Sequence, residues 1–141
     1  MAHPSDDIHD VAIVVYDDFM SLDAFGPLEV FNGANGVLIR KGLPAHYRPR
    51  LVSVDGRAPA CSSGPSITTD GPLPSHDAMA DTVIVSGGDG TLSPEATTPI
   101  IDWLADIEPG RLASVCSGAL ILAAAGRLDG KQATTLSLIH I

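Results

Sequence analysis

A short apolar strand, a cysteine and an alanine-rich helix follow one another in Arg111-Leu-Ala-Ser-Val-Cys-Ser-Gly-Ala-Leu-Ile-Leu-Ala-Ala-Ala-Gly126. A side chain on a tight strand-to-helix turn is held away from the backbone and points into a crevice, the geometry called a nucleophile elbow. Cys116 occupies that turn. Unpaired N–H groups and the positive end of the helix dipole stabilise an anion there, so the thiolate form is favoured. The stretch therefore predicts a reactive thiol at Cys116.

The residues around this cysteine leave a second interpretation open. Ser117 and Gly118 are small, as a sharp turn requires, but Ser114 stands where a hydrolase elbow of the G-x-S-x-G kind has its first glycine. A free cysteine also packs well as a small buried side chain. Taken alone, the stretch allows Cys116 to be either a reactive thiol or a core residue.

The composition is that of one domain with no surface suited to nucleic acid or lipid. The chain has 141 residues, 45% of them hydrophobic, which suffices for one compact core. Eight Lys and Arg against 17 Asp and Glu give a formal net charge of -9, which repels polyphosphate. No apolar run approaches membrane-spanning length. We therefore expect neither nucleic acid nor a membrane as a partner of this chain.

The amino-terminal segment, the cysteines and the histidines carry further expectations. Residues 1–10 are polar and acidic without a signal-peptide pattern, so a disordered tail is predicted before a domain over residues 11–135. A chain without a secretion signal is expected to be cytoplasmic, with Cys61 and Cys116 reduced rather than paired. The histidines are scattered without metal-ligand spacing, so no metal is assigned, and no cofactor is expected.

Apolar runs and turn residues alternate along the chain in the rhythm of an α/β protein. The expected strands cover 11–16, 47–56 with an Asp-Gly turn at its end, 82–86 and 112–115, with edge or hairpin strands at 58–61 and 66–69. The expected helices cover 27–35, 94–107 and 117–125; Gly36 can cap the first, or a second segment can prolong it to Gly42. This alternation predicts a parallel sheet with helices on both faces.

Polar and glycine residues follow three of the predicted strands. Ligands bind at the carboxyl ends of the strands in such sheets, where Asp23, Gly87-Gly88 and Cys116 would meet. We expect backbone N–H groups of Gly88 and Ser117, beside Gly87, to face a developing oxyanion. Asp23 would serve as the acid or base, although a helix N-cap and a flexible glycine turn are the plainer alternatives. Should Asp23 be misplaced, the fallback carboxylate is Glu29.

Three segments carry a resemblance to a known family. They are Leu22-Asp23-x-x-Gly26-Pro27-Leu28-Glu29-Val30-Phe31, Val85-Ser86-Gly87-Gly88, and Ala113-Ser-Val-Cys-Ser-Gly-Ala119 followed by Ala124-Ala-Gly-Arg-Leu-Asp-Gly-Lys-Gln-Ala-Thr-Thr135. Together they resemble the ThiJ/PfpI superfamily, relatives of the class I glutamine amidotransferases. The resemblance implies a flavodoxin-like three-layer α/β sandwich with a mainly parallel sheet, a homodimer, and an elbow cysteine facing a carboxylate, here Cys116 and Asp23.

Two branches of that superfamily share this pattern and imply different functions. One is the amino-terminal sensor domain of AraC-type transcription regulators, which binds a small molecule and leaves DNA to a carboxy-terminal domain absent here. The other comprises isocyanide hydratase-like enzymes, which use the Cys and Asp pair. We favour the sensor and keep the cysteine-dependent hydratase or hydrolase as the alternative; a redox or aldehyde-stress protein is a third hypothesis.

The end of the chain departs from the family pattern. After Thr135 the relatives continue with His-Trp and further elements, whereas this chain has Leu136-Ser-Leu-Ile-His-Ile141. We therefore predict a partial ThiJ/PfpI-like domain whose carboxy-terminal part is missing, with residues 136–141 a non-native tail. Because a sheet cut there exposes apolar surface and an unpaired strand edge, poor solubility is expected.

Overall fold

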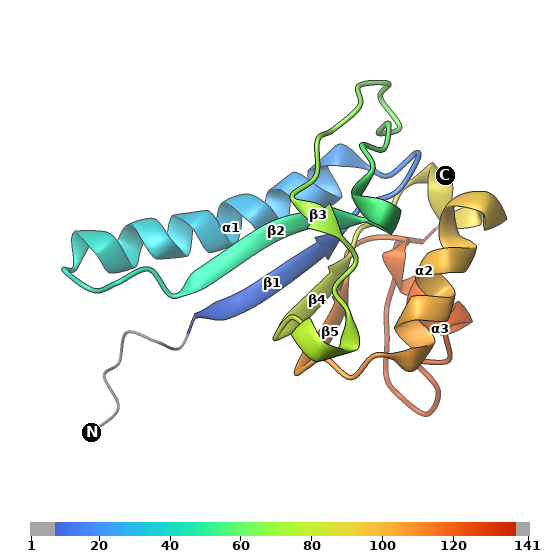
Figure 1. The fold of residues 1–141 in the computed structure, drawn as a ribbon. Coiled ribbons are helices and arrows are strands. Elements are labelled where there is room, and N and C mark those ends of the chain that lie inside the picture. The colour runs from blue at the N-terminus through green and yellow to red at the C-terminus, as the bar shows by residue number, and fades with distance from the viewer. Residues whose placement is uncertain (1–7, 138–141) are drawn as a thin grey trace.

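A parallel sheet forms the centre of the computed structural model, which describes residues 8–137 (Figure 1). Its strands are β1 (His9–Val14), β2 (Tyr47–Ser53), β3 (Gly71–Pro72), β4 (Thr82–Val85) and β5 (Arg111–Ser114), in the order β3-β2-β1-β4-β5. Every neighbouring pair is parallel. β1 and β4 are buried on both faces, as their β-branched runs predict for inner strands of a parallel sheet. The predicted flavodoxin-like α/β class is confirmed.

Three helices complete the layers: α1 (Ser21–Arg40), α2 (Pro94–Asp106) and α3 (Gly118–Ala124). α1 lies along β1 and β2, while α3 packs against β4, β5 and α2 (Figure 1). The chain crosses the sheet in one direction from β1 to β2 and in the opposite direction from β4 to β5. Right-handed crossovers in opposite directions place their helices on opposite faces of the sheet. The result is a three-layer sandwich.

The order of the strands places a crevice between β1 and β4. The chain leaves β1 toward β2, then returns across the sheet to form β4 on the other side of β1. Connections that depart in opposite directions leave an opening at the carboxyl ends of two neighbouring strands, where ligands bind in open α/β sheets. The segments that follow β1, β4 and β5 therefore meet at one end of the sheet.

The first helix is longer than predicted. A helix over 27–35 was expected, but α1 extends from Ser21 to Arg40 and includes Pro27 in its interior. The prediction that Pro27 begins the helix is wrong, and Gly36 does not end it. The helix instead closes at Gly42, with φ +74°, which agrees with the alternative that a second segment prolongs it to that glycine. Apolar side chains of α1 pack against the sheet core, and this burial outweighs the low helix propensity of glycine and proline.

The edge of the sheet also differs from expectation. The strands predicted at 58–61 and 66–69 are not formed; those segments make only isolated bridges, Ala60 with Ser66 and Cys61 with Phe19. Prolines and glycines in this part of the chain turn it too often for a ladder. The edge strand is instead β3, whose two residues pair with β2. The turn expected after β2 is present, with Asp55 at φ +57°.

The boundaries of the predicted domain need one correction. His9 and Asp10 belong to β1 and pair with β2, so the disordered tail predicted over 1–10 is wrong for these two residues. Residues 1–7, the rest of that predicted tail, and residues 138–141 lie outside the described residues. Leu136 and Ser137 are described, but nothing in the structure tests whether 136–141 are a non-native tail, and that remains a prediction. Among the helices of residues 8–137, none has the length and apolar character needed to cross a bilayer.

Candidate functional site at the carboxyl ends of the strands

Cys116 lies on a sharp turn between a strand and a helix, as predicted. β5 ends at Ser114, α3 begins at Gly118, and Cys116 adopts φ +55° between them. A left-handed backbone is costly for a residue other than glycine and persists only where its surroundings hold it. The hydroxyl of Thr135 donates to the Cys116 carbonyl oxygen at 2.8 Å. The side chain is half-buried and its thiol is free.

Asp23 and the turn at Cys116 meet at Gly87. The Gly87 N–H donates to Oδ2 of Asp23 at 3.1 Å. A Cβ atom on Gly87 would lie 2.7 Å from Oδ2 of Asp23 and 2.8 Å from the Ser117 nitrogen. Asp23 in the first turn of α1, the loop after β4 and the turn after β5 therefore converge on one point. The N-cap of α1 is Met20, so Asp23 does not fill that alternative role.

Gly88 connects the same loop to Ser117 and differs in part from expectation. Its N–H donates to Oγ of Ser117 at 3.0 Å, so the donor predicted to face an oxyanion is occupied within the protein. Gly88 has φ +132°, and a Cβ there would overlap the Met20 nitrogen. The Ser117 N–H, in contrast, has no acceptor among residues 8–137. The two predicted donors therefore differ: the Gly88 N–H is used within the protein, whereas the Ser117 N–H is not used within the described part of the chain.

Cys116 opens onto a small pocket. The hollow measures about 190 Å³ and is lined by Met20, Gly88, Asp89, Thr91, Leu92, Cys116, Ser117 and Leu136. Asp23 does not line it, although its Oδ2 and the Ser117 nitrogen both lie close to Gly87. Cys116 is therefore not sealed in the core. It borders a space with mostly apolar walls and a few polar groups, a lining like that of small-molecule sites in a hollow smaller than their roughly 300–1,000 Å³.

Tyr16 is a residue of this region that the sequence analysis assigned only to the buried strand. Its side chain is 2% exposed, and its hydroxyl donates to the Ser86 carbonyl oxygen at 2.6 Å. Burial raises the pKa of Tyr16 far above its usual range, and the nearby charges of Asp23 and Cys116 raise it further. A buried phenol requires a hydrogen-bond partner. A tyrosine at the end of an inner strand was therefore the sequence signal that could have placed Tyr16 at this site.

Neither Glu29 nor Cys61 lines the pocket at Cys116, although Cys61 bridges to Phe19, which also bridges to Gly88. Glu29, the fallback carboxylate, is exposed on α1. Cys61 is a second free thiol, 3% exposed, and its Sγ lies 3.2 Å from the Ser63 hydroxyl, a hydrogen bond that lowers the pKa of Cys61. Within residues 8–137, no group of three His, Cys, Asp or Glu side chains is placed to hold a metal ion.

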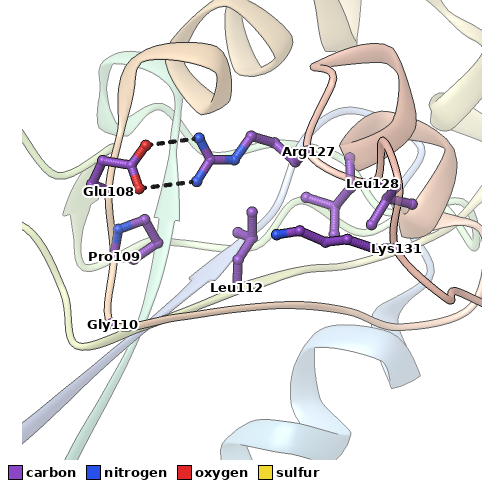
Figure 2. A pocket seen from close by; sticks show the side chains of 8 residues that line it. Glu108, Pro109, Gly110, Leu112, Arg127, Leu128 and Lys131 are labelled. Carbon is purple, nitrogen blue, oxygen red and sulfur yellow. Dashed lines mark hydrogen bonds and ion pairs between the residues drawn. The ribbon is translucent and has the colours of Figure 1, made fainter.

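A second hollow of about 250 Å³ lies at the other end of β5 (Figure 2). Leu112 and Leu128 line it, and Arg127 from the segment after α3 donates to Glu108 at 3.2 Å across its rim. This hydrogen bond and the charge of Arg127 lower the pKa of Glu108. The lining of this second hollow includes none of the predicted site residues.

Comparison with known proteins identifies relatives of two kinds. An uncharacterized protein in the cpoL 5′ region of Streptomyces lividans is 40% identical over 134 residues, which cover 90% of this chain and 86% of that protein. The HTH-type transcriptional regulator GbdR of Pseudomonas aeruginosa is 32% identical over 121 residues, which cover 85% of this chain but 32% of the regulator. The chain thus spans about a third of the length of that regulator.

Solved structures share the fold. A ThiJ/PfpI family protein from Pseudomonas syringae has a TM-score of 0.70 at 24% identity, covering 92% of this chain and 54% of that one. An AraC family transcriptional regulator from Pseudomonas putida has a TM-score of 0.58 at 18% identity, covering 85% of this chain and 69% of that one.

The match to a protein family extends over both the sheet and the site. The DJ-1/PfpI family matches residues 9–140, a range that contains Asp23, the Gly87-Gly88 loop and Cys116. Since this range covers nearly the whole chain, and the fold agrees with it, the chain belongs to the DJ-1/PfpI family.

Proposed function

We propose that this domain is the ligand-sensing part of an AraC-type transcription regulator. The similarity to GbdR carries the proposal, because it extends over 85% of this chain yet takes up only 32% of the regulator. The matched part is an α/β sheet domain, so a helix-turn-helix unit belongs to the rest of such a protein. With a net charge of -9, this domain itself is unsuited to DNA. A regulator of this kind acts in the cytoplasm.

The pocket at Cys116 is the ligand site in this proposal. Cys116 contributes a thiol at the pocket wall, and the Ser117 N–H contributes a donor without an acceptor among the described residues. The Asp23 carboxyl group meets that N–H at Gly87, just outside the pocket lining. A site that presents a donor and a soft nucleophile among apolar walls, with a carboxylate close behind them, would orient a small polar molecule. We call Cys116 a nucleophile elbow on this basis.

The gene that encodes the chain tests the sensor proposal. We expect its uninterrupted reading frame to contain the α/β domain followed by two helix-turn-helix units. In the complete protein, a small molecule that stabilises the domain in a thermal-shift screen should also change promoter binding. A complete frame with no helix-turn-helix unit would refute the proposal.

A ligand screen tests the pocket directly. Compounds that raise the melting temperature of the chain should lose most of their effect in Cys116→Ser or Asp23→Ala. Cys61→Ser serves as the matched control, because Cys61 is a free thiol outside the pocket. Equal losses in Cys116→Ser and Cys61→Ser would place the ligand elsewhere.

The strained turn at Cys116 supports a second candidate, a cysteine-dependent hydratase. Thiolate attack on the terminal carbon of an isocyanide, protonation of the adduct and hydrolysis by one water would give an N-substituted formamide and return the thiol. Asp23, whose Oδ2 meets the Ser117 nitrogen at Gly87, would be the acid or base. Turnover of an aryl isocyanide, lost in both Cys116→Ser and Asp23→Ala, would establish this activity. No turnover by the purified protein would eliminate it.

The outer face of α1 supports a homodimer. Leu22, Val30 and Val37 are 76%, 68% and 43% exposed and lie on one side of the helix, with Gly26 and Gly33 between them. An exposed apolar stripe on a long helix is suited to an identical stripe on a second copy. Light scattering should give twice the mass of the chain, and Val30→Glu should reduce it to a monomer. A monomer at all concentrations would contradict the dimer.

A further inference from the structure

Tyr16 has no part in the function proposed above, yet it is built into the same end of the sheet. It lies two residues after β1, is almost fully buried, and donates its hydroxyl hydrogen to the Ser86 carbonyl oxygen at 2.6 Å. Ser86 directly follows β4 and directly precedes the Gly87-Gly88 loop. The phenol therefore contacts the backbone at the point where the site begins.

One peptide group joins this tyrosine to Asp23. The Ser86 carbonyl and the Gly87 N–H are the two ends of a single peptide unit, and that N–H donates to Oδ2 of Asp23 at 3.1 Å. Hydrogen bonds linked in this way polarise one another: donation to the carbonyl makes the N–H of the same peptide a better donor. The phenol thus strengthens the bond that holds the carboxylate.

The peptide between them is held in place by its neighbours. Oγ of Ser86 donates to the Val14 carbonyl oxygen at 2.7 Å, and the backbone N–H of Ser86 donates to the same oxygen at 3.3 Å. The Met20 N–H donates to the Gly87 carbonyl oxygen at 2.8 Å. Because the groups that flank this peptide unit are hydrogen-bonded on both sides, its rotation toward other partners is restrained.

The electrostatic environment keeps the phenol in its donor form. Burial is the main cause that raises the pKa of Tyr16, followed by the negative charge of Asp23, and Cys116 adds a smaller effect in the same direction. The Ser86 hydrogen bond opposes this shift only in part. Tyr16 is therefore protonated at neutral pH, and its hydroxyl lies within electrostatic reach of both Asp23 and Cys116.

We propose that Tyr16 is a positioning residue, which holds the Asp23 carboxylate beside the Cys116-Ser117 turn through the Ser86-Gly87 peptide. The proposal rests on the proposed role of this pocket as the functional site. It assigns Tyr16 no contact with a ligand; its effect on the site passes through the peptide group.

The first test observes the peptide directly. In Tyr16→Phe, which removes only the hydroxyl, the Gly87 amide proton and nitrogen resonances should move upfield, because the N–H is less polarised. Tyr47→Phe is the matched control, since among residues 8–137 the Tyr47 hydroxyl makes no hydrogen bond. Gly87 resonances that stay in place in Tyr16→Phe, or move equally in Tyr47→Phe, would overturn the proposal.

The second test measures coupling between Tyr16 and Asp23. The alkylation rate of Cys116 by iodoacetamide at pH 7, read by peptide mass spectrometry to separate it from Cys61, should change at least threefold in Tyr16→Phe. The same substitution in an Asp23→Asn background should change the rate by less than half of that factor. A purely structural loosening would give the same factor in both backgrounds, and that result would overturn the proposal.

Should Tyr16→Phe fail to fold, a stronger donor gives the opposite test. In Tyr47→Phe, the only tyrosine left is Tyr16, so growth on 3-fluorotyrosine places a more acidic phenol at that position alone. The Gly87 amide resonances should then move downfield. No movement would refute the coupling of Tyr16 to the Gly87 N–H through the Ser86-Gly87 peptide. These resonances are measured without a ligand or DNA. The positioning role of Tyr16 and the sensor function can therefore fail independently.

Discussion

Glycine residues lie in contrasting surroundings in two regions of the chain. In the loop after β4, a Cβ on Gly87 would lie 2.7 Å from Asp23 and one on Gly88 would overlap the backbone of Met20. On the outer face of α1, a Cβ on Gly26 or Gly33 would have no neighbour within 4 Å. The first region is crowded by segments from three parts of the chain, whereas the second is open.

This difference separates the site from the surface around it. Where backbone segments approach one another, hydrogen bonds can be held at fixed distances, and a site keeps its geometry at the expense of tolerance to substitution. Where glycine faces open space, it adds nothing to the packing of the chain and weakens the helix. Replacing glycine by alanine should therefore lower the free energy of unfolding in the first region and raise it in the second.

The largest effect is expected for Gly88→Ala. The residue has φ +132° and its Cβ would overlap Met20, so we expect a loss of about 3 kcal/mol or more in the free energy of unfolding. Urea denaturation followed by the fluorescence of Trp103, the single tryptophan, measures it. A loss below 1 kcal/mol, as for an ordinary surface position, would show that the loop is not crowded.

A smaller loss is expected for Ser117→Ala. Ser117 is 5% exposed and its Oγ accepts the Gly88 N–H, which would be left without a partner. Such an unpaired donor costs about 1–2 kcal/mol. Ser75→Ala, at an exposed position without a side-chain cap bond, is the control measured in the same urea titration. Equal stability of the two variants would contradict the role of Ser117 in the loop.

The open region should respond in the opposite direction. Gly33→Ala is expected to raise the free energy of unfolding by about 0.5–1 kcal/mol, because alanine is the better helix former and nothing crowds the new methyl group. Unfolding at low protein concentration measures this gain without the contribution of a dimer. A loss of stability under those conditions would contradict the open surroundings of Gly33 within the chain.

The smallest effect concerns an exposed ion pair at the amino ends of the strands. A hydrogen bond from Arg48 holds the pKa of Asp10 below its ordinary value of 3.8, so the pair contributes stability above that pH and loses it as pH falls through the lowered value. Because Arg48 is 59% exposed, Asp10→Asn should cost about 0.5 kcal/mol or less at pH 7. The difference from the natural chain should shrink below about pH 4; a difference that grows there would contradict the assignment.

Local patterns in the chain predicted much of this molecule. The apolar runs at 11–16 and 82–85 are typical of inner strands, and the small residues around Cys116 indicated the sharp turn. The same logic failed for α1, where Pro27 and three glycines suggested a shorter helix. Packing of the helix against the sheet overcame those local preferences, and no local pattern reports such packing.

The positions of Asp23 and Cys116 at strand ends follow from the order of residues along the chain, since parallel strands bring their carboxyl ends together. The hydrogen-bond partners of the loop after β4 do not follow from the order of residues. That the Gly88 N–H is taken by Ser117, and that Tyr16 reaches Asp23 through one peptide, depends on segments 29, 64 and 70 residues apart. Such bonds arise because buried polar groups must pair with whatever the folded chain places beside them.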